Sequence, residues 1–196
     1  MQCYYFIKRC YLINKMGKKT YFTTVDVALT GVFSALWIVM NLTLGPLSFS
    51  LTGLPALHAF GIFFTLLLVA WVTGRFGTSS MAGIIGTIFA ILLGAPALIV
   101  CFSASAVVFD VLMFANHHKI RIKRNSLAIT AIVTMVSSYL AGVLIILFFM
   151  GGGLQYALTF WGAWTLAGGI LALAITLPVI IALEKANVRK IKGDRD

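Results

Sequence analysis

The amino-acid sequence predicts an all-α fold, an integral membrane bundle of six transmembrane helices. Of the 196 residues, 61% are hydrophobic and only 10% are charged, and the mean hydropathy is +1.02. A soluble domain is about half apolar and about a quarter charged. Long apolar segments also follow one another with short connections, which leaves no room for a soluble domain of ordinary size. We therefore expect one membrane domain.

Six segments are long and apolar enough to cross a bilayer, which takes roughly 17–25 residues. They are about 23–44, 56–73, 78–96, 98–116, 126–149 and 160–183. Turn and breaker residues separate them at 45–55, 74–77, 94–96, 117–124 and 151–153. This division predicts a cytosolic or interfacial N-terminal segment (1–22), a membrane domain (23–184) and a basic cytosolic tail (185–196).

The distribution of basic residues predicts the orientation, because Lys and Arg are retained on the cytosolic side of short loops. With the N-terminus inside the cell, all fifteen Lys and Arg residues fall in cytosolic segments, while the loops 45–55, 94–97 and 150–159 carry no charge. We expect a multi-pass protein of the cell membrane with both termini cytosolic. The basic run at 117–124 is expected to anchor on anionic lipid headgroups. Nucleic acid is not an expected partner, because it requires a basic face on a folded domain.

The motifs expected of an enzyme or a metalloprotein do not occur in the sequence. There is no G-x-S-x-G turn for a nucleophile and no Walker motif for ATP hydrolysis. Cys3, Cys10 and Cys101 lack the spacing of metal ligands, and His117 and His118 have no Cys or carboxylate companions at ligand spacing. We therefore expect no enzymatic activity, no metal site and no cofactor.

Asp110 is the one acidic residue well inside a predicted span. A carboxylate at a helix centre costs about 2.5–3.5 kcal/mol, so it should face protein or water. Ser103, one heptad earlier, shares its helix face, and no basic residue lies within any span. We expect both residues to hold a cationic or amino-bearing ligand in a cavity open to the outside. The alternative is a neutral carboxyl that hydrogen-bonds hydroxyls or carbonyls and fixes the bundle.

The first span presents two different faces. Ala28, Gly31 and Ala35 form a stripe of small residues, which lets another helix approach closely. Trp37 and Asn41 point roughly a third of a turn away, at about 100° per residue. We expect the stripe to dock a partner and the other two residues to contact a ligand. The alternatives are internal packing for the stripe and anchoring at the membrane interface for Trp37.

Three more residues lie near the outer ends of spans and complete the predicted ligand site. His58, at the outer start of the second span, either caps a site or is hydrated at the membrane interface. Trp161 and Trp164 open the sixth span, where they form either an aromatic belt or a stacking wall for a flat heterocycle. In the third span, Gly83 and Gly86 favour close packing within the bundle.

Residues 22–184 resemble the membrane-embedded substrate-binding component, the S-component, of energy-coupling factor transporters, which import vitamins and trace nutrients. The likeness rests on six spans, a cytosolic N-terminus, the Ala28, Gly31 and Ala35 stripe, an outer loop at 45–55 that could act as a lid, and the glycines of the third span. In that family an Ala-x-x-x-Ala stripe docks onto the coupling subunit, and here the four-apart pair is Gly31 and Ala35. The stretch GAPALIVCFSASAVVFDVLMF is similar to the thiamine or hydroxymethylpyrimidine type, with Asp110 at a Glu position.

The resemblance implies a function and partners. It implies capture of a vitamin or vitamin precursor from outside, with thiamine or its pyrimidine precursor as the best guess. It also implies a membrane coupling subunit and two cytosolic ATPases, with ATP binding reorienting the subunit to release its ligand inside. The alternative is a stand-alone proton-coupled transporter of small molecules that uses Asp110.

Overall fold

The computed structural model describes residues 22–117, 120, 124–151 and 153–185. The predicted N-terminal segment 1–22, apart from Phe22, lies outside the described residues, as does the predicted tail 185–196 apart from Lys185. Most of the basic run at 117–124 lies outside them too.

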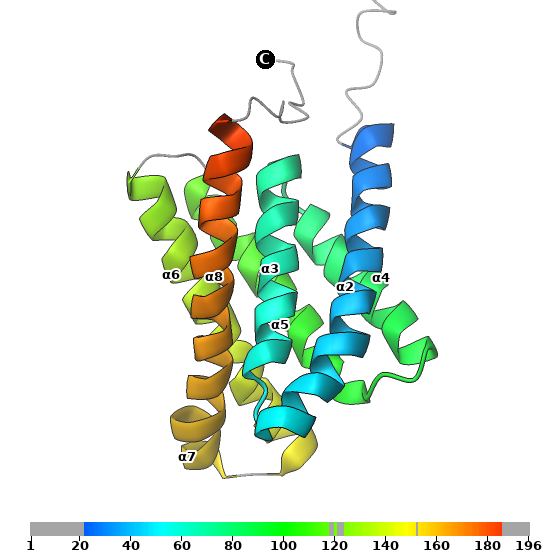
Figure 1. The fold of residues 1–196 in the computed structure, drawn as a ribbon, viewed down its shortest axis with the longest axis vertical. Helices are drawn as coiled ribbons and strands as arrows, with labels where there is room; N and C mark the ends of the chain where they lie inside the picture. Colours follow the sequence, from blue (N-terminus) through cyan, green and yellow to red (C-terminus); the bar gives the residue numbers. More distant parts are fainter. Residues whose placement is uncertain (1–21, 118–119, 121–123, 152, 186–196) are drawn as a thin grey trace, which may run out of the picture.

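The described chain is a bundle of helices that run alternately up and down (Figure 1). They are α2 (Thr24–Thr52), α3 (Ala56–Thr73), α4 (Thr78–Leu92), α5 (Val100–Leu112), α6 (Arg124–Ile145), α7 (Leu154–Tyr156) and α8 (Gly162–Lys185). Tighter 3-10 turns at Ala97–Ile99 and Met113–Asn116 extend α5 at its two ends. Wider π turns at Ile146–Met150 and Ala157–Trp161 extend α6 and connect α7 to α8. The predicted all-α fold is confirmed for the described residues.

Five helical stretches are long and apolar enough to cross a membrane. They are Thr24–Thr52, Ala56–Thr73, Ala97–Asn116, Asn125–Met150 and Leu154–Lys185. Helix α4 is apolar but has only 15 residues, which span about 22 Å at a rise of 1.5 Å per residue. The described helices are therefore compatible with a multi-pass membrane protein. The count of six crossings and the orientation of the termini remain predictions.

The predicted outer loop at 45–55 is wrong, because α2 continues through Pro46 to Thr52. The φ angle of proline is compatible with a helix, so the helix need not end there. Because proline has no backbone N–H, one hydrogen bond is lost and the helix bends. Figure 1 shows α2 bending in its last turns. The chain reverses only at Gly53, whose φ of 67° suits glycine, and the Ser48 hydroxyl donates to the Leu54 carbonyl across this turn.

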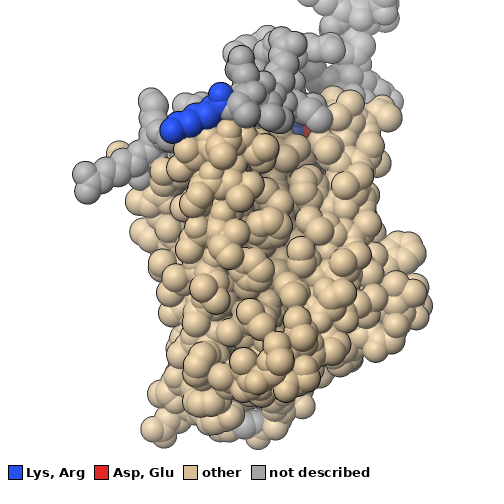
Figure 2. Space-filling model, in the orientation of Figure 1, with Lys and Arg blue, Asp and Glu red and all other residues tan. Residues whose placement is uncertain are grey.

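Helix α2 buries polar residues and exposes apolar ones. Its buried positions are Asp26, Thr30, Ser34, Trp37, Asn41, Gly45 and Ser48, whereas Val25, Val27, Val32, Val39, Leu47 and Leu51 are exposed. A surface helix of a soluble protein has the reverse arrangement. Figure 2 shows the same preference over the side of the bundle, which is drawn almost entirely without charged atoms. Such a surface suits a lipid environment.

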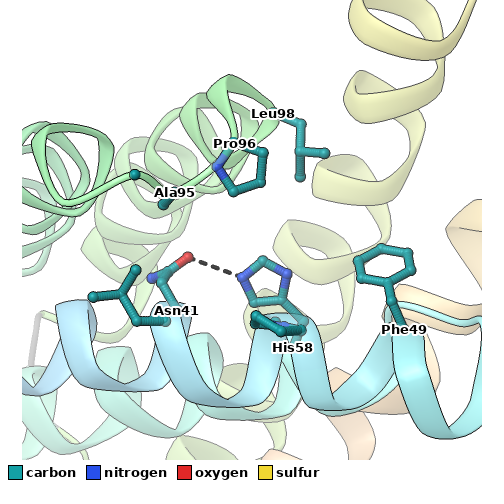
Figure 3. Close-up of a pocket in the computed structure, with 10 residues that line it drawn as sticks. Asn41, Phe49, His58, Ala95, Pro96 and Leu98 are labelled. Carbon is teal, nitrogen blue, oxygen red and sulfur yellow. Dashed lines mark hydrogen bonds between the residues drawn. The ribbon is translucent and has the colours of Figure 1, made fainter.

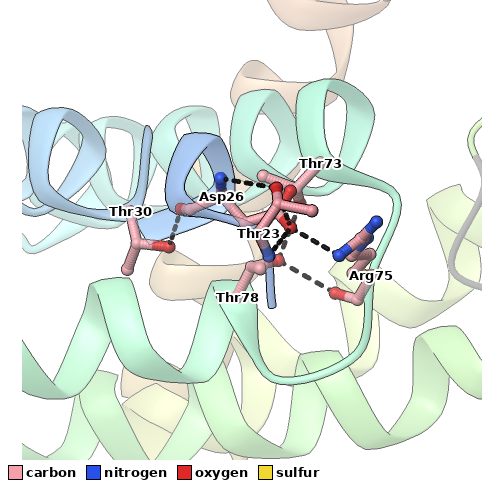
Figure 4. Close-up of polar contacts among 6 residues, drawn as sticks. All are labelled: Thr23, Asp26, Thr30, Thr73, Arg75 and Thr78. Atoms are coloured by element: carbon pink, nitrogen blue, oxygen red, sulfur yellow. Dashed lines mark hydrogen bonds and ion pairs between the residues drawn. The ribbon is translucent and has the colours of Figure 1, made fainter. Parts of the chain in front are cut away.

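An ion pair joins α2 to the α3–α4 turn at the end of the bundle where α2 begins and α8 finishes (Figures 1 and 4). The Arg75 Nη1 atom lies 2.5 Å from the Asp26 Oδ2 atom, and the Asp26 side chain is buried. Asp26 also completes a capping box with Thr23, because each side chain accepts a hydrogen bond from the other's backbone N–H. Thr73 and Thr78 are hydrogen-bonded beside this pair, at 2.7 Å between their hydroxyl oxygens.

Two glycines of α4 make room for the indole of Trp37, which is fully buried. A Cβ on Gly86 would lie 2.6 Å from a ring carbon of Trp37, and one on Gly83 would lie 2.9 Å from the Ala106 Cβ on α5. The prediction that these small residues permit close packing within the bundle is confirmed. This contact fixes α2, α4 and α5 around one aromatic side chain.

Candidate ligand pocket

A cavity of about 180 Å³ (Figure 3) is lined by segments that Figure 1 shows at the opposite end of the bundle from the start of α2 and the α3–α4 turn. Its walls come from the second half of α2, the first turn of α3 and the connection between α4 and α5. The lining residues are Asn41, Leu42, Gly45, Pro46, Phe49, His58, Gly94, Ala95, Pro96 and Leu98. We call this cavity the ligand pocket.

A histidine and an asparagine supply the polar side chains of the ligand pocket. The His58 Nε2 and Asn41 Oδ1 atoms are 2.9 Å apart, and the Asn41 Nδ2 donates to the Trp37 carbonyl at 2.8 Å. Only 2% of His58 and 3% of Asn41 are exposed. His58 was predicted either to cap a site or to be hydrated at the membrane interface. The structure buries it in the pocket wall, so interfacial hydration is wrong.

The position of the imidazole follows from its neighbours. The His58 ring lies over Gly45, where a Cβ would be 3.6 Å from the ring, and its centroid is 4.8 Å from that of Phe102. Figure 3 shows the ring edge with its nitrogens turned toward Pro96 and Leu98. The second ring nitrogen, Nδ1, is buried and has no hydrogen-bond partner among the described residues.

Trp37 and Ser103 meet at a shared hydroxyl beside the pocket. The Trp37 Nε1 donates to the Thr87 hydroxyl at 3.1 Å, and the Ser103 hydroxyl donates to the same oxygen at 2.5 Å. These contacts join α2, α4 and α5 in the buried interior. Both residues belong to the predicted ligand site, but neither lines the pocket. Trp37 is not an interfacial anchor, because it is fully buried.

Asp110 lies near the far end of α5, away from the pocket. One carboxylate oxygen accepts hydrogen bonds from the Gly77 N–H at 2.9 Å, the Ser80 N–H at 3.1 Å and the Ser80 hydroxyl at 2.8 Å. Gly77 is the N-cap residue of α4 and has no side chain to satisfy the free N–H groups there. A negative side chain is stabilised at this position by the helix dipole. Asp110 therefore caps α4 from a neighbouring helix.

We expected a cavity at Asp110 and Ser103, but neither residue lines the ligand pocket. Both side chains do face the same way, as their shared helix face predicted, but α4 packs against that face. The carboxylate finds its partners in the backbone and hydroxyl groups of α4. The expectation that this face of α5 borders a cavity is corrected accordingly, because α4 packs against it.

The two tryptophans at the start of the last helix have different surroundings. Trp161 is 7% exposed, and its ring stacks on Phe49 of the pocket wall with centroids 6.3 Å apart. Trp164 is 38% exposed and meets the edge of Phe160. Trp161 thus supports the pocket from behind Phe49, whereas Trp164 faces outward, as expected for an aromatic belt.

The small-residue stripe of α2 lies on the surface of the bundle. Ala28, Gly31 and Ala35 are all exposed, and a Cβ on Gly31 would meet no atom within 4 Å. Internal packing, one of the two predicted roles for this stripe, is therefore wrong for the described residues. Trp37 and Asn41 point in a different direction from the stripe, as predicted, and are buried.

Sequence reasoning missed most of the pocket wall. Gly45, Pro46 and Phe49 were assigned to a loop, Pro96 to a break between spans, and Leu98 to the start of the fourth span with no role in the site. The signal that could have found them is spacing. Trp37, Asn41, Gly45 and Phe49 recur every four residues and so share one helix face. Phe49 belongs to this pattern only if the helix continues past Pro46, as it does in the structure.

Comparison with models of protein families, with curated proteins and with solved structures found no match to this chain. Function is therefore inferred from the pocket and from the surface of the bundle.

Proposed function

We propose that this protein is the membrane-embedded substrate-binding subunit, the S-component, of an energy-coupling factor importer in the cell membrane. The observation that carries the proposal is the ligand pocket with its buried His58–Asn41 pair, at the end of the bundle away from Arg75 and Lys185. Concave, mostly apolar pockets with a few convergent polar groups are the usual form of small-molecule sites.

The size of the pocket supports a small ligand. A volume of about 180 Å³ suits a single ring with short substituents rather than a peptide or a lipid tail. We propose that the ligand is a vitamin or vitamin precursor, and the single-ring pyrimidine precursor of thiamine is the first compound to test.

The exposed face of α2 supports a partner helix. Ala28, Gly31 and Ala35 are small and exposed, which allows another transmembrane helix to approach the α2 backbone closely. We propose that a membrane coupling subunit docks there and that two cytosolic ATPases supply the energy. The described part of the chain has no metal-binding cluster of His, Cys, Asp or Glu.

A stand-alone proton-coupled transporter that uses Asp110 receives less support. Asp110 caps α4 and does not line the pocket, so a proton on its carboxylate would have no direct contact with a bound ligand.

The proposal is tested by ligand binding and by partner docking. A thermal-shift screen of vitamins and precursors should find a compound that raises the melting temperature of the purified protein, because a ligand specific for the native state stabilises it. Ala35→Leu should abolish co-purification with a co-expressed coupling subunit and leave ligand binding intact.

Ala174→Leu is the matched control for docking, since Ala174 is an exposed alanine on α8. It should co-purify as the wild type does. Equal co-purification of both variants would remove the α2 stripe from the interface, and a screen in which no compound stabilises the protein would count against the binding function itself.

A further inference from the structure

We propose that the ligand pocket takes an uncharged, planar ligand that donates a hydrogen bond to Nδ1 of His58. This inference rests on the proposed binding function and names the chemistry that the pocket selects. It departs from the sequence expectation of a cationic ligand held by Asp110.

The hydrogen-bond chain through Asn41 determines which imidazole nitrogen carries the proton. The Asn41 Nδ2 donates to the Trp37 carbonyl, which can only accept, so the Asn41 Oδ1 is the atom that faces His58. That oxygen can only accept, so the Nε2 of His58 must donate to it. In the neutral imidazole the other nitrogen, Nδ1, is then an acceptor with a free lone pair.

The described part of the protein leaves this buried acceptor unsatisfied. His58 is 2% exposed, and Nδ1 has no hydrogen-bond partner among the described residues. A buried polar atom without a partner is costly, and a ligand N–H or O–H that reaches it removes that cost. Figure 3 shows the nitrogen-bearing ring edge facing the space under Pro96 and Leu98.

The pocket wall gives a cation no counter-charge. None of the ten lining residues is acidic or basic by type, apart from the imidazole of His58. The buried carboxylates of the described chain are engaged at the other end of the bundle, Asp26 with Arg75 and Asp110 with the first turn of α4. Moving a cation from water into such an apolar wall is unfavourable without a paired charge.

The shape of the wall favours a flat ring. An apolar cavity of about 150 Å³ is known to hold a benzene molecule, and the ligand pocket, at about 180 Å³, has room for a ring with one short substituent. Phe49 and Pro96 offer apolar surfaces on two sides of the space in front of His58 (Figure 3).

Three related probes distinguish the effect of ligand charge on affinity from the effect of a ligand N–H donor. Benzamide is neutral and has N–H donors, N,N-dimethylbenzamide is neutral without them, and benzamidinium has donors and a positive charge. We expect the full-length protein in nanodiscs to bind benzamide on the order of tenfold tighter than the dimethyl compound, which leaves the acceptor unpaired. Benzamidinium should bind more weakly than benzamide.

His58→Phe keeps a ring of similar size and removes both nitrogens. In this variant the preference for benzamide over N,N-dimethylbenzamide should vanish, which separates the hydrogen bond from the larger size of the dimethyl group. Trp164→Phe, a conservative change on an exposed ring outside the pocket, should keep the preference. An unchanged preference in His58→Phe would overturn the proposal.

A measurement on the wild type tests the tautomer without any variant or ligand. The chain has three histidines, so ¹⁵N chemical shifts of labelled imidazoles can be assigned. We expect one buried histidine with a protonated Nε2 and a bare Nδ1, and a protonated Nδ1 would overturn the inference. Binding of benzamidinium as tight as that of benzamide would overturn it too, while leaving the binding function standing. If the protein melts cooperatively but binds none of the probes or vitamins, both the ligand chemistry proposed here and the proposed binding function would be overturned.

Discussion

Ser80 donates two hydrogen bonds to a single carboxylate oxygen of Asp110, from its backbone N–H at 3.1 Å and from its hydroxyl at 2.8 Å. The Gly77 N–H adds a third at 2.9 Å. An acidic residue in an apolar segment is by default a functional candidate. Here its hydrogen bonds have a structural purpose, since they cap a short helix whose own N-cap residue is glycine.

Asp110→Ala should therefore lower stability more than it lowers ligand binding. The change leaves the N–H groups of Gly77 and Ser80 without their acceptor, and loss of an N-cap costs about 0.5–2 kcal/mol. We expect a lower melting temperature and faster hydrogen exchange at the first turn of α4. Asp110→Asn keeps one acceptor oxygen and should lie between the wild type and Asp110→Ala. A variant that melts like the wild type but no longer binds benzamide would return Asp110 to the ligand site.

Gly86→Ala and Gly31→Ala should change stability in opposite directions. A methyl group on Gly86 would lie 2.6–2.9 Å from Trp37 side-chain atoms, and overpacking of this kind costs about 1–3 kcal/mol. Gly31 also lies inside an α-helix, but it has open space beside it. Alanine there should therefore stabilise α2 by about 0.5–1 kcal/mol. Thermal unfolding in one detergent compares the two. A Gly86→Ala protein as stable as the wild type would contradict the packing of Trp37 against α4.

Gly45→Leu should close the ligand pocket while sparing the partner-docking stripe. A Cβ at Gly45 would lie 3.6 Å from the His58 ring, and the rest of a leucine side chain would have to occupy the space beside the imidazole. We expect benzamide affinity to fall by at least about tenfold, a change of roughly 1.4 kcal/mol, with co-purification of the coupling subunit retained. Ala35→Leu should show the reverse pattern. Loss of both properties in either variant would indicate misfolding rather than two separate surfaces.

Sequence patterns predicted the helices well where the signal is local. The spans that became α3, α5 and α6 begin and end within a few residues of their predicted limits, because hydropathy and turn residues act over a single segment. The prediction failed at Pro46, where a residue that often marks a loop was accommodated inside α2. It also began the last helix at residue 160, whereas a helical path already runs from Leu154 through a π turn.

The candidate site was predicted only in part. Asn41 and His58 were named from their depth and polarity, and the structure brings them to 2.9 Å across 17 residues of sequence. Phe49 and Leu98 were missed because nothing in their own segments marks them as neighbours of a histidine. Ser103 and Asp110 were correctly placed on one helix face, but a ligand was expected where α4 packs. The sequence shows which residues share a face, but not which element packs against that face.

Local composition determined that this chain forms apolar helices with few charged residues, because hydropathy and charge are properties of each segment alone. Only the tertiary structure decided what those residues meet. The Asp110 carboxylate reaches Gly77 and Ser80, 33 and 30 positions away in the chain, and the His58 imidazole reaches an amide on another helix. Such pairings depend on how helices pack against one another, and many packings satisfy the same pattern of apolar segments.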